Sequence, residues 1–389
     1  MSHQPFGRSE DLRRLIELGF ELDIHNGNLL VHHVPYLTGQ RQVQYGILTM
    51  PLTLGGGDVT AAPGNHVAFF VGDVPCDGAG RALGIARPAV HDLGNGLRTN
   101  YQLSARPNPP YRDYEQKVRT YVSLLLGPAR SVDPEATAQT FQPVTESEDE
   151  SPFLYMDTST SRAGLERYAE RLARMRLAIV GLGGTGSYTL DLVAKTSVAE
   201  IHLFDGDRFL QHNAFRSPGA TPAEDLIGGP NKADHWARVY GRMRRGVVPH
   251  PVRVDASNVD ELRDLDFVFI AVDHGPSRAL ILDALAGFGV PHIDVGMGVH
   301  DIDERLSGKT RVSTGTGEHP MDRRRVPTGA DGPEDDYRLN IQIADLNALN
   351  ATLAVIRWKK LVGVYADLGR EHASSYTIAL NEMTNEDVA

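Results

Sequence analysis

Cysteine is nearly absent from this 389-residue sequence, in which Cys76 is the only one. One cysteine excludes an internal disulfide and any zinc site built from several cysteines, and it fits a reducing compartment. The chain also lacks an apolar run of about 18 residues, the length that a helix needs to cross a bilayer. Its opening, "MSHQPFGRSEDLRRLIELGFELDI", has no apolar core of the kind found in secretion signals. We therefore expect a cytoplasmic protein without a membrane partner.

Positive charge is also scarce, because 39 Lys and Arg residues face 50 Asp and Glu residues, for a formal net charge of -11. An acidic surface repels nucleic acids and anionic membranes, so we expect no nucleic-acid partner, although a local basic site is still possible. The content of 41% hydrophobic and 23% charged residues is typical of a globular protein, and the length suffices for two domains.

The residues suggest a domain boundary near position 150. Residues 1–142 contain strand-like runs such as "NLLVHHVPYL" and "HVAFFVGDVP", followed by an amphipathic helical run around "YEQKVRTYVSLLLG". We interpret them as a smaller α+β domain. The acidic stretch "PVTESEDESP", residues 143–152, is predicted to be a solvated linker. Residues 153–389 then form the second domain.

In the second domain, strand-like and helix-like segments alternate. A charged helical run, "SRAGLERYAERLARM", leads into the apolar strand "RLAIV" and a glycine-rich loop. The strands "EIHLFD", "DFVFIAVD" and "PHIDVG" follow, with helices near "KADHWARVYGRMRR" and "SRALILDALAGFG". This order predicts an α/β, Rossmann-like fold with a mostly parallel sheet and helices on both faces. In a late helix, one face carries Leu346, Leu349, Leu353 and Ile356, which we interpret as core packing.

The glycine-rich loop indicates a nucleotide site. A loop that turns tightly and brings its N–H groups close to phosphate needs glycine, and the helix that follows, expected to begin near Ser187, adds positive potential. At the end of the next strand, Asp205 is placed to accept hydrogen bonds from ribose hydroxyls. The loop glycines are Gly181, Gly183, Gly184 and Gly186. Taken alone, the G-x-G-x-x-G spacing that Gly181, Gly183 and Gly186 form favours a nicotinamide-dependent oxidoreductase.

Residues further along favour ATP instead. Arg216, Lys232 and Asp273 each follow a strand or precede a helix, and Arg278 comes five residues after Asp273. A hydride-transfer site has no need for an arginine, a lysine and a carboxylate at the phosphate end of one nucleotide. A triphosphate attacked at its α-phosphorus does, because the cations balance phosphate charge and the carboxylate can hold Mg²⁺.

The ordered set G-x-G-G-x-G-S, D-x-D, N-x-x-R, K, and a strand ending in D with R five residues later resembles the ThiF/MoeB/E1 superfamily. Members of that superfamily activate ubiquitin-like and sulfur-carrier proteins. The resemblance covers about residues 161–363. The family motif usually reads N-L-x-R-Q, and Ser217 stands here in place of the glutamine.

The resemblance implies an E1-like adenylyltransferase that uses ATP and Mg²⁺ to adenylate the C-terminal glycine carboxylate of a ubiquitin-like protein. It implies that Asp205 binds the ribose, that Asp273 holds Mg²⁺, and that the phosphates are bound by Asn213, Arg216 and Lys232. Family members often form dimers in which an arginine located before the first strand reaches the partner's site. Arg162 is our candidate in a homodimer, with Arg167 behind it.

Many relatives pass the activated carboxylate to a downstream cysteine, and MoeB-like and ThiF-like members hold zinc with two C-x-x-C pairs. No cysteine follows position 76 here, so we expect no zinc and no such thioester. Three routes remain open. The acyl-adenylate is handed directly to another nucleophile, Thr328 accepts the acyl group as an ester, or Cys76 serves from the first domain. An unactivated hydroxyl needs a base.

The first domain resembles the uncharacterised domain that precedes ThiF-like modules in bacterial ubiquitin-like operons, which often occur in defence settings. We expect it to dock the ubiquitin-like protein or an E2-like protein, or to support dimerisation. Its strand-region histidines, His25, His32, His33 and His66, are not expected to form a metal site. Other possible classes are an enzyme that adenylates a small molecule or tRNA, a catalytically silent E1 partner subunit and, last, a nicotinamide oxidoreductase.

Overall fold

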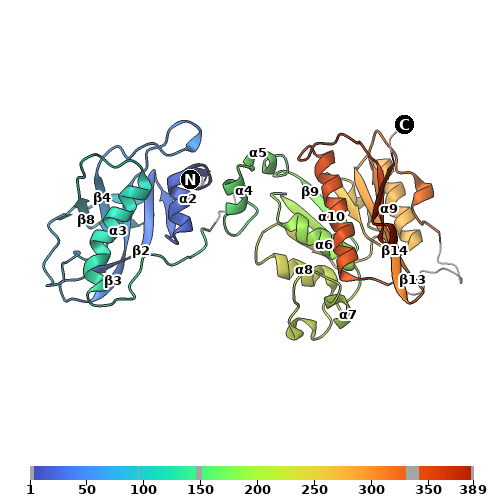
Figure 1. Cartoon of the computed structure of the whole chain (residues 1–389), viewed down its shortest axis with the longest axis horizontal. Helices are drawn as coiled ribbons and strands as arrows, with labels where there is room; N and C mark the ends of the chain where they lie inside the picture. Colours follow the sequence, from blue (N-terminus) through green and yellow to red (C-terminus); the bar gives the residue numbers. More distant parts are fainter. Residues whose placement is uncertain (1–3, 95, 146–150, 330–340, 387–389) are drawn as a thin grey trace. The chain divides into compact units, whose positions relative to one another are not determined.

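The computed structural model describes residues 4–94, 96–145, 151–329 and 341–386 (Figure 1). The described chain divides into two compact units. One comprises Met1–Glu150 with Tyr155–Gly164, and the other comprises Ser151–Leu154 with Leu165–Ala389. Part of the expected linker, residues 146–150, lies outside the described residues.

The segment Tyr155–Gly164, which the sequence assigned to the second domain, packs with the first unit. Its Ser161 is buried and accepts a hydrogen bond through its carbonyl from Arg13 at 3.2 Å. Met156 packs against the first hydrophobic core. Phe153, in contrast, bridges to Arg244 in the second unit. The contacts of a few side chains therefore decide to which unit residues 155–164 belong. The acidic composition of the preceding linker does not reveal this assignment.

The first unit is a helix-packed antiparallel sheet, as expected for an α+β domain. Its six-stranded sheet, counted over the described residues, has the order β1-β2-β3-β4-β8-β5, and α3 packs on β2 (Figure 1). Its helices and strands are α1 (Gln4–Arg8), α2 (Glu10–Glu17), β1 (Leu22–His25), β2 (Asn28–Leu37), β3 (Val43–Pro51), β4 (Val67–Val71), β5 (Ala86–Pro88), β6 (Asp92–Gly94), β7 (Leu97–Arg98), β8 (Tyr101–Ser104), α3 (Tyr114–Arg130) and α4 (Thr158–Ala163).

The second unit contains the expected Rossmann-like sheet, with order β11-β10-β9-β12-β13-β14-β15-β16 among the described strands. The first five strands in this order, from β11 through β10, β9 and β12 to β13, run parallel to one another. Strands β14, β15 and β16 each pair antiparallel with the strand before them. Its elements are α5 (Glu166–Ala169), β9 (Arg176–Val180), α6 (Gly184–Ala194), β10 (Glu200–Phe204), α7 (Gln211–Ala214), α8 (Lys232–Tyr240), β11 (Val247–His250), β12 (Phe267–Ile270), α9 (Gly275–Phe288), β13 (His292–Ile302), β14 (Arg305–Gly315), α10 (Ala344–Leu361), β15 (Ala373–Thr377) and β16 (Glu382–Glu386).

Alternation along β9 sends side chains to two different cores, as the pleat of a strand requires. Leu177 and Ile179 join the cluster that contains residues of α6 and α10, whereas Ala178 and Val180 join the cluster that contains residues of α9. Helices therefore cover both faces of the sheet, which confirms the predicted doubly covered fold. Figure 1 shows α6 and α10 side by side over one face.

Two predictions about helices are wrong in detail. The run from Ser161 is not one helix, because Gly164 adopts a φ of 65° and separates α4 from α5. On α10 the apolar stripe is only partly the core face, since Leu346 is buried and Leu353 packs against the core, whereas Ile356 is 39% exposed. The buried residues of α10 include the small Ala351 and Ala354 as well as the large Trp358, and α10 packs on α6. Within the described chain, no helix is both long and apolar enough to span a bilayer.

Candidate nucleotide site at the carboxyl edge of the sheet

The four glycines of the loop are needed for different physical reasons. Gly181 has a φ of 90°, and a Cβ on it would lie 2.5 Å from the carbonyl oxygen of Ala271. A Cβ on Gly186 would lie 2.9 Å from the carbonyl carbon of Gly181. Both positions therefore need glycine because backbone segments approach closely. A side chain on Gly184 would overlap the amide of Asn347 on α10.

Gly183 differs from the other three, because the nearest atom to a Cβ placed there is Gln342 Oε1 at 3.9 Å. It is the N-cap of α6, which begins at Gly184, three residues earlier than expected. A glycine offers no capping side chain, so the first N–H groups of α6 are available to an anion. Of the four loop glycines, Gly183 is therefore the one with open space beside it.

Asp205 follows β10 and ties the loop to the sheet. Its Oδ2 accepts from the Leu182 N–H at 2.7 Å, and its Oδ1 accepts from the Asp207 N–H at 2.8 Å. Lys232 Nζ lies 3.6 Å from Oδ2. Burial raises the pKa of the Asp205 carboxyl, and the nearby Lys232 charge opposes that shift. A carboxylate oxygen can accept more than one hydrogen bond, so Asp205 can still accept one from a ribose hydroxyl.

Lys232 and Asp207 belong to a short charge network at the same edge. The buried Lys232, the first residue of α8, places Nζ 3.0 Å from Asp207 Oδ2. Arg253 donates to Asp207 Oδ1 at 2.7 Å. The Arg253 hydrogen bond, with that of Lys232, lowers the pKa of the Asp207 carboxyl. Arg253 was not predicted, although it follows β11, a parallel strand that ends at this same edge.

The N-x-x-R motif builds a turn that presents Arg216. Asn213 is buried and its Oδ1 accepts from the Leu210 N–H at 2.8 Å, while Ser217 Oγ donates to its carbonyl at 2.6 Å. The pKa of half-buried Arg216 is lowered by desolvation, and the charge of Asp273 opposes this. Its Nε is buried and has no hydrogen-bond partner within the described chain.

Asp273 follows β12 and interacts electrostatically with both Arg216 and Arg253. The structure therefore brings together most of the site residues expected from the sequence. In the part of the chain that the structure describes, no group of three or more His, Cys, Asp or Glu side chains could hold a metal ion by itself. Mg²⁺ commonly takes one or two protein carboxylates and completes its shell with phosphate oxygens and water, a requirement that Asp273 fits.

Thr328 belongs to a segment that lies against the start of α9. A Cβ on Gly275 would lie 3.2 Å from the Thr328 carbonyl carbon and 3.1 Å from that of Gly329. Thr328 is half-buried and takes part in this contact through its backbone. Residues 330–340, which follow this segment, lie outside the described residues.

Two other candidates lie in the first unit. Arg162 on α4 is exposed, and its Nε lies 3.3 Å from Glu17 Oε1. Its assignment to a partner's site stays a prediction. Cys76 is 2% exposed, and its Sγ donates to the Val74 carbonyl at 3.3 Å. Burial, followed by the charge of Asp77, raises the pKa of this thiol, which disfavours the reactive thiolate.

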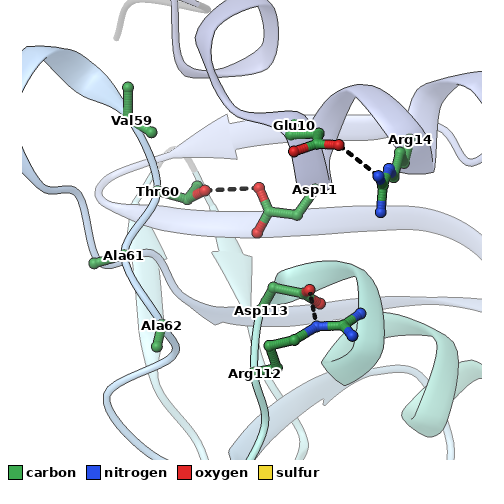
Figure 2. A pocket seen from close by; sticks show the side chains of 9 residues that line it. All are labelled: Glu10, Asp11, Arg14, Val59, Thr60, Ala61, Ala62, Arg112 and Asp113. Carbon is green, nitrogen blue, oxygen red and sulfur yellow. Dashed lines mark hydrogen bonds and ion pairs between the residues drawn. The ribbon is translucent and has the colours of Figure 1, made fainter.

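The first unit also contains a cavity of about 230 Å³ that the sequence did not indicate (Figure 2). It lies at the N-terminal ends of α2 and α3, beside residues 59–62. The carboxylate of Asp11 on α2 connects two segments that line the cavity. It accepts hydrogen bonds from Thr60 Oγ1 at 2.6 Å and from the Tyr114 N–H at 2.9 Å. Arg14 pairs with Glu10, and Arg112 pairs with Asp113. The charges that line the cavity thus satisfy one another.

The fold and the residues at this sheet edge define an α/β nucleotide-binding protein. Residues 158–370 match the ThiF family, and residues 10–158 match a domain of unknown function (DUF6791). Because the first match spans 213 of 389 residues, the chain belongs to the ThiF family.

Two relatives are similar to part of this chain. The "SAMP-activating enzyme E1" of Haloferax volcanii is 33% identical over 124 residues, which is 31% of this chain and 45% of that protein. The "Sulfur carrier protein adenylyltransferase" of Thermus thermophilus is 33% identical over 125 residues, with the same two shares. The chain therefore matches less than half the length of either relative.

Solved structures also resemble this chain, at low identity. E. coli MccB with ATP is 17% identical with a TM-score of 0.43, covering 59% of this chain and 71% of that one. PaaA is 17% identical with a TM-score of 0.47, covering 69% of this chain and 85% of that one.

Proposed function

We propose that this protein is an E1-like adenylyltransferase, which uses ATP to activate the C-terminal glycine carboxylate of a ubiquitin-like protein. Membership of the ThiF family supports this class of reaction. The names of the two relatives, which refer to activating SAMP and to adenylating a sulfur carrier protein, support a small protein as the substrate. A bacterial ubiquitination-like pathway with an E2-like acceptor is the setting that we propose.

The observation that carries the proposal is the unpartnered, buried Nε of Arg216 beside Asp273. A buried donor without an acceptor costs free energy, on the order of 1–3 kcal/mol, unless a ligand completes it. A phosphate group of a bound nucleotide would supply that acceptor, and the N-terminus of α6 also favours an anion. Arg216 and the helix end therefore favour the same kind of ligand.

In the proposed reaction, a carboxylate oxygen of the substrate attacks the α-phosphorus of ATP. The bond from that phosphorus to the oxygen leading to the β-phosphate breaks, so the products are an acyl-adenylate and pyrophosphate. Arg216 and Lys232 stabilise the charge that develops on the phosphates. Lys232 already contacts Asp207, but an ammonium group has three donors and can bind a phosphate as well.

Asp273 would hold Mg²⁺, which supplies positive charge to the triphosphate when it is bound. Asp205 would orient the ribose while its other hydrogen bonds hold the loop. These roles, like those of Asn213 and of Arg162 from the second subunit of a homodimer, are part of the proposal. Asn213 acts by shaping the turn that presents Arg216.

For the acyl group, we propose direct transfer to an external nucleophile or a transient ester on Thr328. Thr328 supports the second route because its backbone lies against Gly275, two residues after Asp273. Cys76 is the weaker candidate, because its thiol is buried and its pKa is raised.

Pyrophosphate exchange into ATP tests the proposal. We expect exchange that requires a glycine-ended ubiquitin-like protein and stops when that protein lacks its last glycine. Asp273→Asn should abolish exchange. The matched control is Asp260→Asn, an exposed carboxylate that pairs with Arg263, and it should leave exchange unchanged. Exchange without any protein partner, or none with a cognate one, would contradict the proposal.

A further inference from the structure

The guanidinium of Arg278 joins three parts of the second unit. Arg278 lies on α9 and is only 5% exposed. Its Nε donates to Asp294 Oδ1 at 3.0 Å and one terminal nitrogen donates to the Pro327 carbonyl at 2.7 Å. The other terminal nitrogen donates to the Val272 carbonyl. All three nitrogens of the group are therefore used by separate acceptors.

A second arginine fixes the orientation of Asp294, which is fully buried on β13. Arg311 on β14 donates to Asp294 Oδ2 at 2.5 Å and to Ser313 Oγ at 2.7 Å. Each carboxylate oxygen thus has its own arginine. A buried carboxylate with both oxygens engaged holds its partners in one geometry, and removing Arg278 leaves Asp294 Oδ1 without this donor while Arg311 still balances the charge.

The two backbone acceptors of Arg278 flank the proposed site. Val272 comes directly before Asp273, and Pro327 comes directly before Thr328. The contact of Gly275 with Thr328 and Gly329 adds a second link between the same two segments. A single side chain therefore connects the end of β12 with the segment Pro327–Gly329.

We propose that Arg278 is a positioning residue for adenylation, which sets the Asp273 carboxylate and the Pro327–Gly329 segment in one arrangement. This inference rests on the proposed function. Arg278 would act through Val272 and Pro327 and would not contact the nucleotide itself. Misplacement of a reacting group by about 1 Å costs on the order of 100-fold in rate, so small shifts of Asp273 would be measurable.

The chain offers a matched control in Arg244, which is 1% exposed and also binds backbone carbonyls. Its acceptors include Thr196 at 3.1 Å and Val198, at the C-terminal end of α6. That end is opposite to the glycine loop. Loss of Arg244 should therefore destabilise the fold without moving Asp273.

The test compares Arg278→Gln, Arg278→Lys and Arg244→Gln in the full chain. Lysine keeps a positive charge beside Asp294 but cannot reach three acceptors in a plane. We therefore expect Arg278→Lys to retain more stability than Arg278→Gln, yet to share its functional defect. Both changes should increase deuterium uptake in peptides that cover residues 321–329. Arg244→Gln should leave that uptake unchanged.

Pyrophosphate exchange supplies the second readout. Both Arg278 variants should lower the exchange rate by about 100-fold and raise the Mg²⁺ concentration for half-maximal exchange, whereas Arg244→Gln should change neither. Unchanged deuterium uptake at 321–329 in both Arg278 variants would overturn the inference, as would a wild-type Mg²⁺ requirement. If wild-type protein shows no exchange with its partner, the proposed function fails, and deuterium uptake alone still decides whether Arg278 holds this segment.

Discussion

The side-chain amide of Asn347 occupies the space that a side chain on Gly184 would need. A Cβ on Gly184 would overlap the amide and would lie 2.7 Å from Asn347 Oδ1. That oxygen accepts from Thr185 Oγ1 at 2.9 Å, and Asn347 is 1% exposed. Gly184 is therefore required by the packing of α10 on α6, in addition to any need for a close approach by phosphate.

Replacing this glycine should be reversible by a second change. Gly184→Ala forces the Asn347 amide from its place, and we expect it to destabilise the protein by about 1–3 kcal/mol. Asn347→Ala in the same chain removes the overlap and should restore most of that loss, because neighbouring residues couple strongly. Urea unfolding of both single variants and the double variant measures the coupling.

Gly186→Ala is the control for this pair, because its obstacle is the Gly181 backbone. Adding Asn347→Ala to Gly186→Ala should give no rescue. If the Gly184→Ala/Asn347→Ala variant is no more stable than Gly184→Ala alone, the packing explanation is wrong. If stability returns but ATP binding does not, phosphate contact is a separate requirement at Gly184.

Arg216 should be dispensable for stability and essential for activity. Its buried Nε lacks a partner in the described structure, so Arg216→Met should leave the free energy of unfolding unchanged or raise it by about 1 kcal/mol. Pyrophosphate exchange should fall by about 100-fold or more. The control is Arg208→Met, because Arg208 donates to the carbonyls of Gly228 and Gly229 and its loss should lower stability. A large stability loss in Arg216→Met would contradict this prediction.

Lys117 should make the stability of the protein depend on alkaline pH. It is 1% exposed, donates to the Asn65 carbonyl at 3.1 Å, and burial lowers its pKa to about 8. The unfolded chain binds this proton more tightly, so the contribution of Lys117 to stability rises with pH between about 8 and 10.5. Below that window both states are protonated, and the contribution no longer changes with pH.

Lys117→Met removes this titration. We expect the stability of the wild type relative to Lys117→Met to increase by on the order of 3 kcal/mol across the window. Urea unfolding at several pH values measures it, and all other groups cancel in the difference. Leu124→Met, at an exposed position on the same helix, removes no titrating group and should show no such change. Parallel stability curves for the wild type and Lys117→Met would refute the assignment.

The sequence revealed those parts of the fold that depend on local pattern. The strand "RLAIV", its glycine loop and the residues in motif order lie where expected, because carboxyl ends of neighbouring parallel strands converge on one edge. Arg253 and Asn347 were missed because they reach the site only through tertiary packing. Arg253 follows a short strand that contains a proline. Asn347 lies on α10, where the apolar residues predicted a core face that does not include Asn347.

The domain boundary shows a similar limit. Charge and polarity indicated a linker, but the assignment of Tyr155–Gly164 depends on contacts of Ser161 and Met156 with the first unit. Strands β14 and β16 form local hairpins with β13 and β15, but the pairing of β14 with β15 joins segments that are distant in the sequence. Register of this kind has no local signature in the sequence.

Cys76 should be inert in the folded protein. Its thiol is buried and its pKa is raised, so little thiolate is present at neutral pH. We expect a thiol reagent to modify it far more slowly in the native protein than in urea. Cys76→Ala should cost about 1 kcal/mol of stability through the lost sulfur while leaving pyrophosphate exchange unchanged.

The same variant decides among the routes for the acyl group. After reaction with ATP and the ubiquitin-like partner, intact-mass analysis with and without hydroxylamine reports any ester or thioester. An adduct that persists in Cys76→Ala and disappears in Thr328→Val would support the ester, and no adduct in any variant would support direct transfer. An adduct that is lost only in Cys76→Ala would show that the buried thiol becomes accessible during turnover, contrary to what its burial and raised pKa lead us to expect.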